Sequence, residues 1–149
     1  MGIISIIADK VLDILDAVVD EKSARMSKIN GRGLEVRGIW GTKELFIYGS
    51  PVTPEILDEH NISRTMNEFH WGDDSEGSEM AAFAILLWFL EKDEALVRKD
   101  IFFRDFVMRF PKEDFEILYN FVGWNNRITP GKYRKLVSTI DQAPGNDDD

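Results

Sequence analysis

The longest apolar run of the chain, eleven consecutive residues from Met80 to Leu90, dominates its pattern of hydrophobic and polar positions. A helix that crosses a bilayer needs about 20 apolar residues, so this shorter run predicts a helix buried inside a protein core. Ser78 is the expected N-cap of the helix, and Leu90 is its expected end. We therefore expect this helix to form the centre of the fold.

A second helix is predicted from about Glu94 to Phe110, after a charged turn at residues 91–93 and before Pro111. Its apolar positions keep helical spacing, which predicts one face packed inward and one charged face in solvent. The expected inward residues are Leu96, Val97, Phe103, Phe106, Val107 and Phe110, and the expected outward residues are Arg98, Lys99, Arg104 and Arg109.

The N-terminal segment from Ile3 to about Met26 has the i, i+3, i+4 recurrence of an amphipathic helix, which Gly31 and Gly33 should end. Its apolar seam advances by alternating steps of three and four residues, as in paired helices. The seam fits docking on the same domain, self-association or membrane binding, although the acidic opposite face disfavours anionic lipid. The candidate oligomerisation residues are Ile4, Ile7, Val11, Ile14 (or Leu15) and Val18.

Two runs rich in β-branched and aromatic residues, Leu34 to Ile39 and Lys43 to Val52, flank Gly41 and Thr42 and predict a β-hairpin. An isolated hairpin is marginally stable in water, so this one must pack on a helix. Thr53 as an N-cap and Pro54 at the first helical position then predict a short helix, which Asn61 should close.

The segment from Asp114 to Trp124 fits both a strand and a helix, and we interpret it as a helix. Thr129 and Pro130 are expected to start a last short helix. The predicted fold class is α+β, with a small antiparallel hairpin or sheet packed on a helical bundle. The expected organisation is an N-terminal amphipathic helix in residues 1–30, a single domain in residues 31–141 and a disordered acidic tail in residues 142–149.

Charge and cysteine content exclude several functional classes. The 149-residue chain has 27 acidic and 18 basic residues and a formal net charge of −9, so its surface repels phosphate backbones and direct nucleic-acid binding is not expected. The absence of Cys removes disulfides, thiol catalysis and thiolate metal sites. The N-terminus lacks the basic region of a signal peptide, so we expect a cytoplasmic protein without membrane attachment.

The acidic loop before the central helix is the main candidate for chemistry. Its carboxylates together with His70 supply oxygen and imidazole groups of the kind that bind Mg²⁺, Mn²⁺ or Ca²⁺. The spacing matches no known cation loop, and acidic residues at a helix start are stabilised by the helix dipole without any ligand. Nucleophile-elbow and P-loop motifs are absent from the sequence. We therefore assign no catalytic residue, metal or cofactor.

Aromatic residues offer a further possible binding surface. Phe69, Trp71, Trp88 and Phe89 have the composition of a ligand pocket wall, but we favour a role in core packing. Trp124, beside two asparagines, is the better candidate for an exposed aromatic side chain. The candidate interaction residues are Asp73, Asp74, Glu76, Glu79 and Trp124.

The residues around the acidic loop resemble a known pattern. Asn61 and Ser63 precede Phe69, Trp71 and Gly72, and Gly77 and Ala82 continue the order. Over about residues 34–124 the chain resembles a domain-of-unknown-function family of bacterial and phage proteins, whose hallmark reads roughly F-x-W-G-Y-G-G-S-G-P-A-Q-L-A. The loop itself departs from the hallmark, with Asp73, Asp74, Ser75 and Glu76 in place of Tyr, Gly, Gly and Ser. The resemblance implies a small sheet packed on helices and brings no assigned activity.

Three functional hypotheses follow. We favour a non-enzymatic, acidic accessory factor, encoded by a phage or mobile element, that binds a basic surface of a host machine and modulates or inhibits it, as a host-defence inhibitor does. The second is a small-molecule or metal-dependent enzyme that uses the loop after Trp71. The third is a structural homo-oligomer assembled through the N-terminal helix.

Overall fold

A computed structural model describes residues 21–128 of the chain. These residues form a helix at 21–32, the strands β1 (Leu34–Ile39), β2 (Glu44–Ile47) and β3 (Ser50–Val52), and the helices α2 (Glu55–Glu59), α3 (Glu76–Phe89) and α4 (Lys92–Asp105). A short 3₁₀ helix, η1 (Val107–Arg109), strand β4 (Phe115–Tyr119) and a helix at 121–128 follow. The expected α+β class is confirmed.

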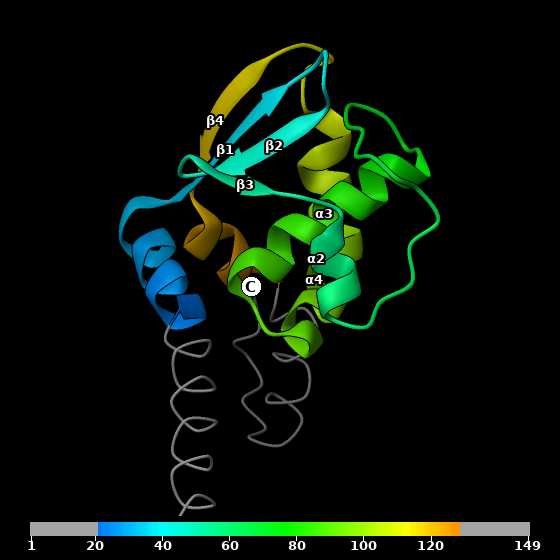
Figure 1. The fold of residues 1–149 in the computed structure, drawn as a ribbon. Coiled ribbons are helices and arrows are strands. Elements are labelled where there is room, and N and C mark those ends of the chain that lie inside the picture. Colours follow the sequence, from blue (N-terminus) through cyan, green and yellow to red (C-terminus); the bar gives the residue numbers. More distant parts are fainter. Residues whose placement is uncertain (1–20, 129–149) are drawn as a thin grey trace, which may run out of the picture.

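The four strands form one antiparallel sheet in the order β3-β2-β1-β4. Helices α2, α3 and α4 lie on one side of it (Figure 1). Along β1, Leu34, Val36 and Gly38 are buried while Arg37 is exposed, as expected for a sheet with one covered face. The predicted hairpin is therefore present, and it packs on helices as expected.

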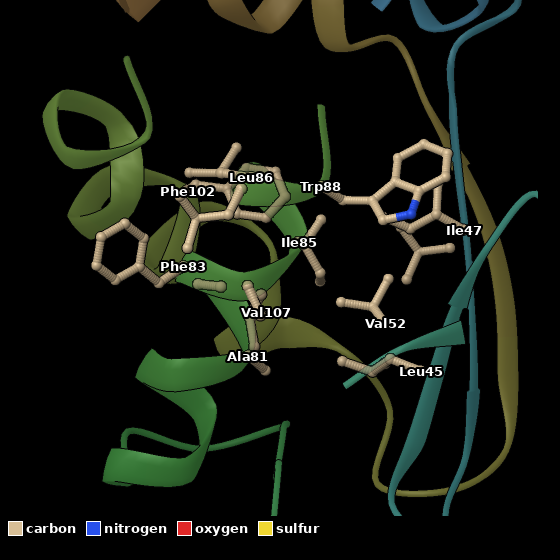
Figure 2. Packing of buried hydrophobic residues seen from close by; sticks show 14 of the residues in the cluster. Leu45, Ile47, Val52, Ala81, Phe83, Ile85, Leu86, Trp88, Phe102 and Val107 are labelled. Atoms are coloured by element: carbon tan, nitrogen blue, oxygen red, sulfur yellow. The ribbon is translucent and has the colours of Figure 1, made fainter. Parts of the chain in front are cut away.

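Helix α3 is the centre of the core, as the apolar run predicts. Every residue from Met80 to Leu90 is buried. Leu45, Ile47 and Val52 of the sheet face Ile85 and Trp88 of this helix, whereas Phe83 and Leu86 project toward Phe102 of α4 (Figure 2). A helix covered on several sides at once needs apolar residues all round, which explains the unbroken run.

The second predicted strand is in fact two strands. Tyr48 and Gly49 both have positive φ angles, of 52° and 79°, and they join Ile47 to Ser50 in a two-residue turn. Such turns match the twist of a hairpin and require positive φ at both central positions. The glycine after Tyr48 was the sequence signal for this reversal.

The caps of two helices differ from expectation. The N-cap of α3 is Ser75, whose Oγ accepts a hydrogen bond from the Ser78 backbone N–H at 3.3 Å, so Ser78 lies inside the helix. The short helix α2 begins one residue later than predicted, after Pro54, and no side chain caps it. Asn61, with a φ of 60°, follows its end as expected.

The second predicted helix is shorter, and its faces are assigned differently. Helix α4 ends at Asp105, and η1 follows Phe106. Leu96 and Val97 are 45% and 49% exposed, while Arg98 is only 5% exposed. Arg98 donates from Nε to Asn125 Oδ1 at 2.7 Å and pairs with Glu94 at 2.9 Å. The expected orientation is wrong for these three positions because Arg98 fastens α4 to the helix at 121–128.

The interpretation of Asp114 to Trp124 as a helix is also wrong in its first half. Residues Phe115–Tyr119 form β4, which pairs with β1, and a helix starts only at residue 121. Phe115 is buried and Ile117 and Tyr119 are half-buried on the covered face, whereas Leu118 is 64% exposed. The segment forms a strand, as its alternating pattern allows, because the edge of β1 offers backbone groups for pairing.

Both ends of the chain lie outside the described residues. The helix at 21–32 extends past Met26 and stops before Gly33, whose φ is +97°. The seam Ile4, Ile7, Val11, Ile14 and Val18, the helix expected from Thr129, and the domain limits drawn at residues 141 and 142 are not described. No helix among the described residues has the length and apolar content needed to cross a membrane.

Candidate functional site

The acidic loop runs from Phe69 to the first turn of α3, and two buried aromatic residues hold its start in place. Phe69 and Trp71 are buried, which confirms the interpretation of these aromatics as core residues. The Trp71 indole Nε1–H donates to the Pro111 carbonyl at 3.0 Å. Gly72 has a φ of +87°, a conformation that favours glycine. The chain therefore turns sharply just before the acidic residues.

Asp73 points inward and holds the start of α3. Its Oδ1 accepts hydrogen bonds from Ser75 N at 3.1 Å, from Ser75 Oγ at 2.7 Å and from Ser78 Oγ at 2.8 Å. Ser78 is fully buried, so this carboxylate satisfies a hydroxyl that water cannot reach. Ser75 thus caps the helix, and Asp73 holds the Ser75 side chain in the capping position.

The other oxygen of Asp73 faces cationic groups. His70 Nε2 lies 3.0 Å from Asp73 Oδ2, and Lys112 Nζ lies 4.0 Å from the same oxygen. Partial burial raises the pKa of Asp73, but the hydrogen bonds from Ser75 and Ser78 and the proximity of His70 outweigh it and bring the pKa down to about 2. Asp73 is thus ionised throughout the physiological range and engaged within its own loop.

The remaining acidic candidates point outward. Asp74, Glu76 and Glu79 are exposed, and Glu76 Oε1 accepts a hydrogen bond from Thr65 Oγ1 at 2.8 Å. Within residues 21–128, none of these three carboxylates takes part in an ion pair. The structure thus separates the predicted interaction residues into one inward carboxylate and three outward ones.

Glu76 and Glu79 border a surface hollow of about 300 Å³ between α2, α3 and α4. Its floor is apolar, because Leu57, Met80 and Phe83 line it while remaining largely buried. Arg64 and Lys99 stand at its rim, where Arg64 pairs with Asp58 at 3.0 Å and Lys99 pairs with Asp100 at 3.1 Å. The hollow therefore combines an apolar floor with two carboxylates that form no ion pair and two cations that each form one.

A larger cavity of about 530 Å³ lies near His70 and Asp73, with Lys43 in its lining. The Trp40 ring lies 5.3 Å from the His70 ring, and Lys43 Nζ lies 3.7 Å from the centroid of Trp40. Lys43 also donates to the Trp40 carbonyl at 2.6 Å. The cavity thus lies between the β1–β2 turn and the acidic loop, and residues of both segments line it.

Sequence reasoning missed the residues that other segments bring to the loop and to the start of α3, namely Trp40, Lys43, Arg64 and Lys99. No local pattern marks them, because their proximity depends on how the hairpin turn and α4 pack against α3. Among residues 21–128, no three His, Asp or Glu side chains are grouped as metal ligands would be.

Trp124 is not an exposed aromatic. Its side chain is 3% exposed, it packs among Phe102, Phe106 and Phe121, and its Nε1–H donates to Asp105 Oδ2 at 2.9 Å. The polar neighbours misled the interpretation because only one face of this helix is in solvent. Trp124 is therefore a core residue and does not belong to the surface formed by the acidic loop.

Comparison with known proteins places most of the described residues in one family. A family model described as a family of unknown function (DUF6166) matches residues 33–123, which contain the whole sheet, helices α2, α3 and α4, and the acidic loop. No curated protein and no solved structure matches the chain.

Proposed function

This chain belongs to that family of unknown function, so we propose from its own surface that it is a non-enzymatic accessory factor that binds a protein carrying basic side chains. The observation that carries the proposal is the hollow beside α3, where the exposed carboxylates of Glu76 and Glu79 border an apolar floor.

The chemistry of this hollow suits the side chains of lysine and arginine. These residues have an apolar stem and a charged head, so a stem can cover Met80 while the head reaches Glu76 or Glu79. Asp74, which is also exposed, extends the acidic border along the loop. Because Arg64 and Lys99 already have acidic partners, they oppose an incoming cation less than free cations would.

In the proposed mechanism, the protein acts by covering a basic surface of its partner. A protein with a formal net charge of −9 approaches a basic partner faster than a neutral one would, and the association weakens as salt screens the charges. Screening acts over a Debye length of about 8 Å at physiological ionic strength. The inward role of Asp73 supports a binding function over catalysis, because this carboxylate is already bound to Ser75, Ser78 and His70.

The resemblance to bacterial and phage proteins extends the proposal to the origin of the protein. On this hypothesis, a phage or mobile element encodes the factor, and its partner is a basic surface on a host machine that it modulates or inhibits. The exposed acidic replacements in the loop, Asp74 and Glu76, are then what adapts this member to its partner.

A charge-reversal variant tests the proposal. Tagged full-length protein and the variant Glu76→Lys/Glu79→Lys are used to capture partners from a lysate of the cells that encode the protein, at low and at high salt. We expect a stoichiometric partner that the unmodified protein retains at low salt and loses at high salt. The variant should lose that partner at both salt concentrations.

The matched control is Asp93→Lys/Glu113→Lys, which reverses two exposed acidic residues away from the hollow. It changes the net charge equally, so it separates the contribution of the hollow from that of overall charge. A partner that binds both variants equally well, or the absence of any salt-sensitive partner, would count against the proposal.

A second candidate function rests on the cavity of about 530 Å³ beside His70 and Asp73. The partly exposed imidazole of His70, Lys43 and Phe69 line this cavity and provide polar and aromatic groups of the kind that orient a small ligand. In that case His70→Asn abolishes ligand binding, while the charge reversal at Glu76 and Glu79 leaves it unchanged.

A further inference from the structure

The C-terminal end of α3 is closed by cations from a different helix. The last turn of α3 contains no basic residue. Instead, the carbonyl of Leu90 accepts a hydrogen bond from Lys22 Nζ at 2.7 Å, and the carbonyl of Trp88 accepts one from an Arg25 Nη at 2.8 Å. The Arg25 guanidinium also lies 4.2 Å from the centroid of the Trp88 ring. Cations are favourable at this end of a helix, so these contacts hold the helix at 21–32 on α3.

His60 joins Lys22 and Arg25 in a cluster of basic residues at this end of α3. The two groups beside its ring determine which ring nitrogen carries a proton. His60 Nδ1 lies 2.8 Å from the carbonyl oxygen of Ile56. A carbonyl can only accept a hydrogen bond, so Nδ1 carries a proton. Lys22 Nζ lies 2.9 Å from His60 Nε2, and an ammonium group can only donate. Nε2 must therefore be the unprotonated nitrogen, and the imidazole in this contact is neutral.

We propose that protonation of His60 releases the helix at 21–32 from the end of α3, which makes the docking of this helix sensitive to pH. A protonated imidazole has no lone pair with which to accept the Lys22 hydrogen bond, and it places a positive charge 2.9 Å from an ammonium group. The two charges then repel each other across the interface between α2 and the helix at 21–32.

Among the described residues, Lys22 is the charged side chain in direct contact with the His60 ring. Burial lowers the pKa of Lys22, the carboxylate of Glu91 opposes that effect, and Arg25 adds to it. Arg25 is itself paired with Glu21 at 2.8 Å, so the cluster holds two cations and two carboxylates. Helix α2 supplies Glu59 as the exposed residue that precedes His60. An imidazolium would be a third positive charge in a partly buried cluster.

The direction of the pH dependence follows from this geometry. The docked contact requires an unprotonated Nε2 on His60. Docking is therefore expected to weaken as the pH is lowered from neutral.

Backbone amide hydrogen exchange of the full-length protein measures this docking directly. Exchange of residues 21–32 is compared at pH 7.5 and pH 5.5, after correction for the intrinsic pH dependence of amide exchange, with α3 as the internal reference for global stability. We expect corrected exchange of residues 21–32 to be about tenfold faster at pH 5.5, with α3 much less affected.

Three variants identify the group responsible. His60→Gln should remove the pH sensitivity of residues 21–32, and His70→Gln should retain it, because these are the protein's two histidines. If His60→Gln destabilises the whole protein, Lys22→Met provides the second test, since without the ammonium group protonation of His60 meets less repulsion and the pH effect shrinks. Equal corrected exchange at both pH values, or sensitivity that persists in both the His60 and Lys22 variants, overturns the inference.

Discussion

At the scale of single residues, neighbouring acidic residues of one loop have opposite roles. Asp73 turns inward to Ser75 and Ser78, whereas Asp74 is exposed. The positive φ of Gly72 precedes them both and sets the direction in which the loop enters α3. The sequence predicted that acidic residues gather at the start of this helix, but which one faces inward depends on the buried position of Ser78.

Replacing Asp73 should therefore destabilise the protein in a way that replacing its neighbour does not. Asp73→Ala removes the hydrogen bonds to Ser75 and leaves the buried Ser78 hydroxyl without this acceptor, so we expect a loss of about 2 kcal/mol in the free energy of unfolding. Asp74→Ala is the matched control and should stay within about 0.5 kcal/mol of the unmodified protein. Urea denaturation at pH 7 checks both values, and equal losses would contradict the inward role of Asp73.

The charge of Asp73 should also make stability depend on pH. Its pKa of about 2 in the folded protein lies below the ordinary value of about 3.9. The stabilisation is therefore complete above about pH 4 and is lost as the pH falls toward 2. Asp73→Asn lacks the charge, so the gap in unfolding free energy between it and the unmodified protein should be narrower at pH 3 than at pH 7. A gap of constant size would show that the charge contributes nothing.

The burial of some residues was predictable from the sequence, and that of others was not. Trp71 and Trp88 were assigned to the core from the sequence, and both are buried. Trp124 and Arg98 are buried as well, and Asp105 and Asn125 accept hydrogen bonds from them across the interface of α4 with the helix at 121–128. Such long-range partners leave no trace in the local pattern.

At the scale of the elements, the hairpin and the central helix followed from the sequence, whereas β4 did not. The residues of β4 satisfy both helical and strand periodicities, so the local pattern alone left both possibilities open. Pairing with β1 over Leu34 to Gly38 decides the outcome. A segment at the sheet edge takes its structure from its partner strand, which sequence periodicity does not reveal.

Gly38 is the point where β1 and β4 fit most closely. A Cβ atom at this position would lie 2.3 Å from Phe115 Cε1. The Phe115 ring cannot easily move away, because it packs on Trp71 and Phe110 with centroid distances of 5.4 Å and 4.5 Å. We expect Gly38→Ala to lower the free energy of unfolding by about 2 kcal/mol through overpacking.

Gly41, in the turn between β1 and β2, provides the matched control for this substitution. A Cβ atom there would meet nothing within 4 Å, so Gly41→Ala should change stability by no more than about 0.5 kcal/mol. Thermal and urea denaturation of the two variants measure the difference. If Gly38→Ala is as stable as Gly41→Ala, the Phe115 ring is not fixed against the sheet as described.

At the scale of the whole molecule, α3 has charges of opposite sign at its two ends. Its first turn carries Glu76 and Glu79 near Asp73, and its last carbonyls receive hydrogen bonds from Lys22 and Arg25. Each group has the sign that the helix dipole favours at that end. The acidic end faces solvent beside an apolar hollow, while the opposite end is covered by the helix at 21–32.

The proposed binding surface exists only in the assembled fold. Its floor combines Leu57 of α2 with Met80 and Phe83 of α3, and Lys99 of α4 stands at the rim. The sequence identified the acidic border because those residues lie within a few positions of one another in the chain. It did not identify the hollow, because the floor residues are read as ordinary core positions until the three helices are placed together.

The most direct test of the central claim is photo-cross-linking from inside the hollow. Ser63 lines it and is exposed, so a photoreactive amino acid at this position samples whatever occupies the site in cells while Glu76 and Glu79 stay intact. Ser27, exposed on the helix at 21–32, is the control position. We expect one cross-linked partner protein from position 63, absent from position 27 and lost when Glu76 and Glu79 are both changed to Lys. A cross-link from position 63 that survives the charge reversal, or no protein cross-link there at all, would contradict binding through the acidic hollow.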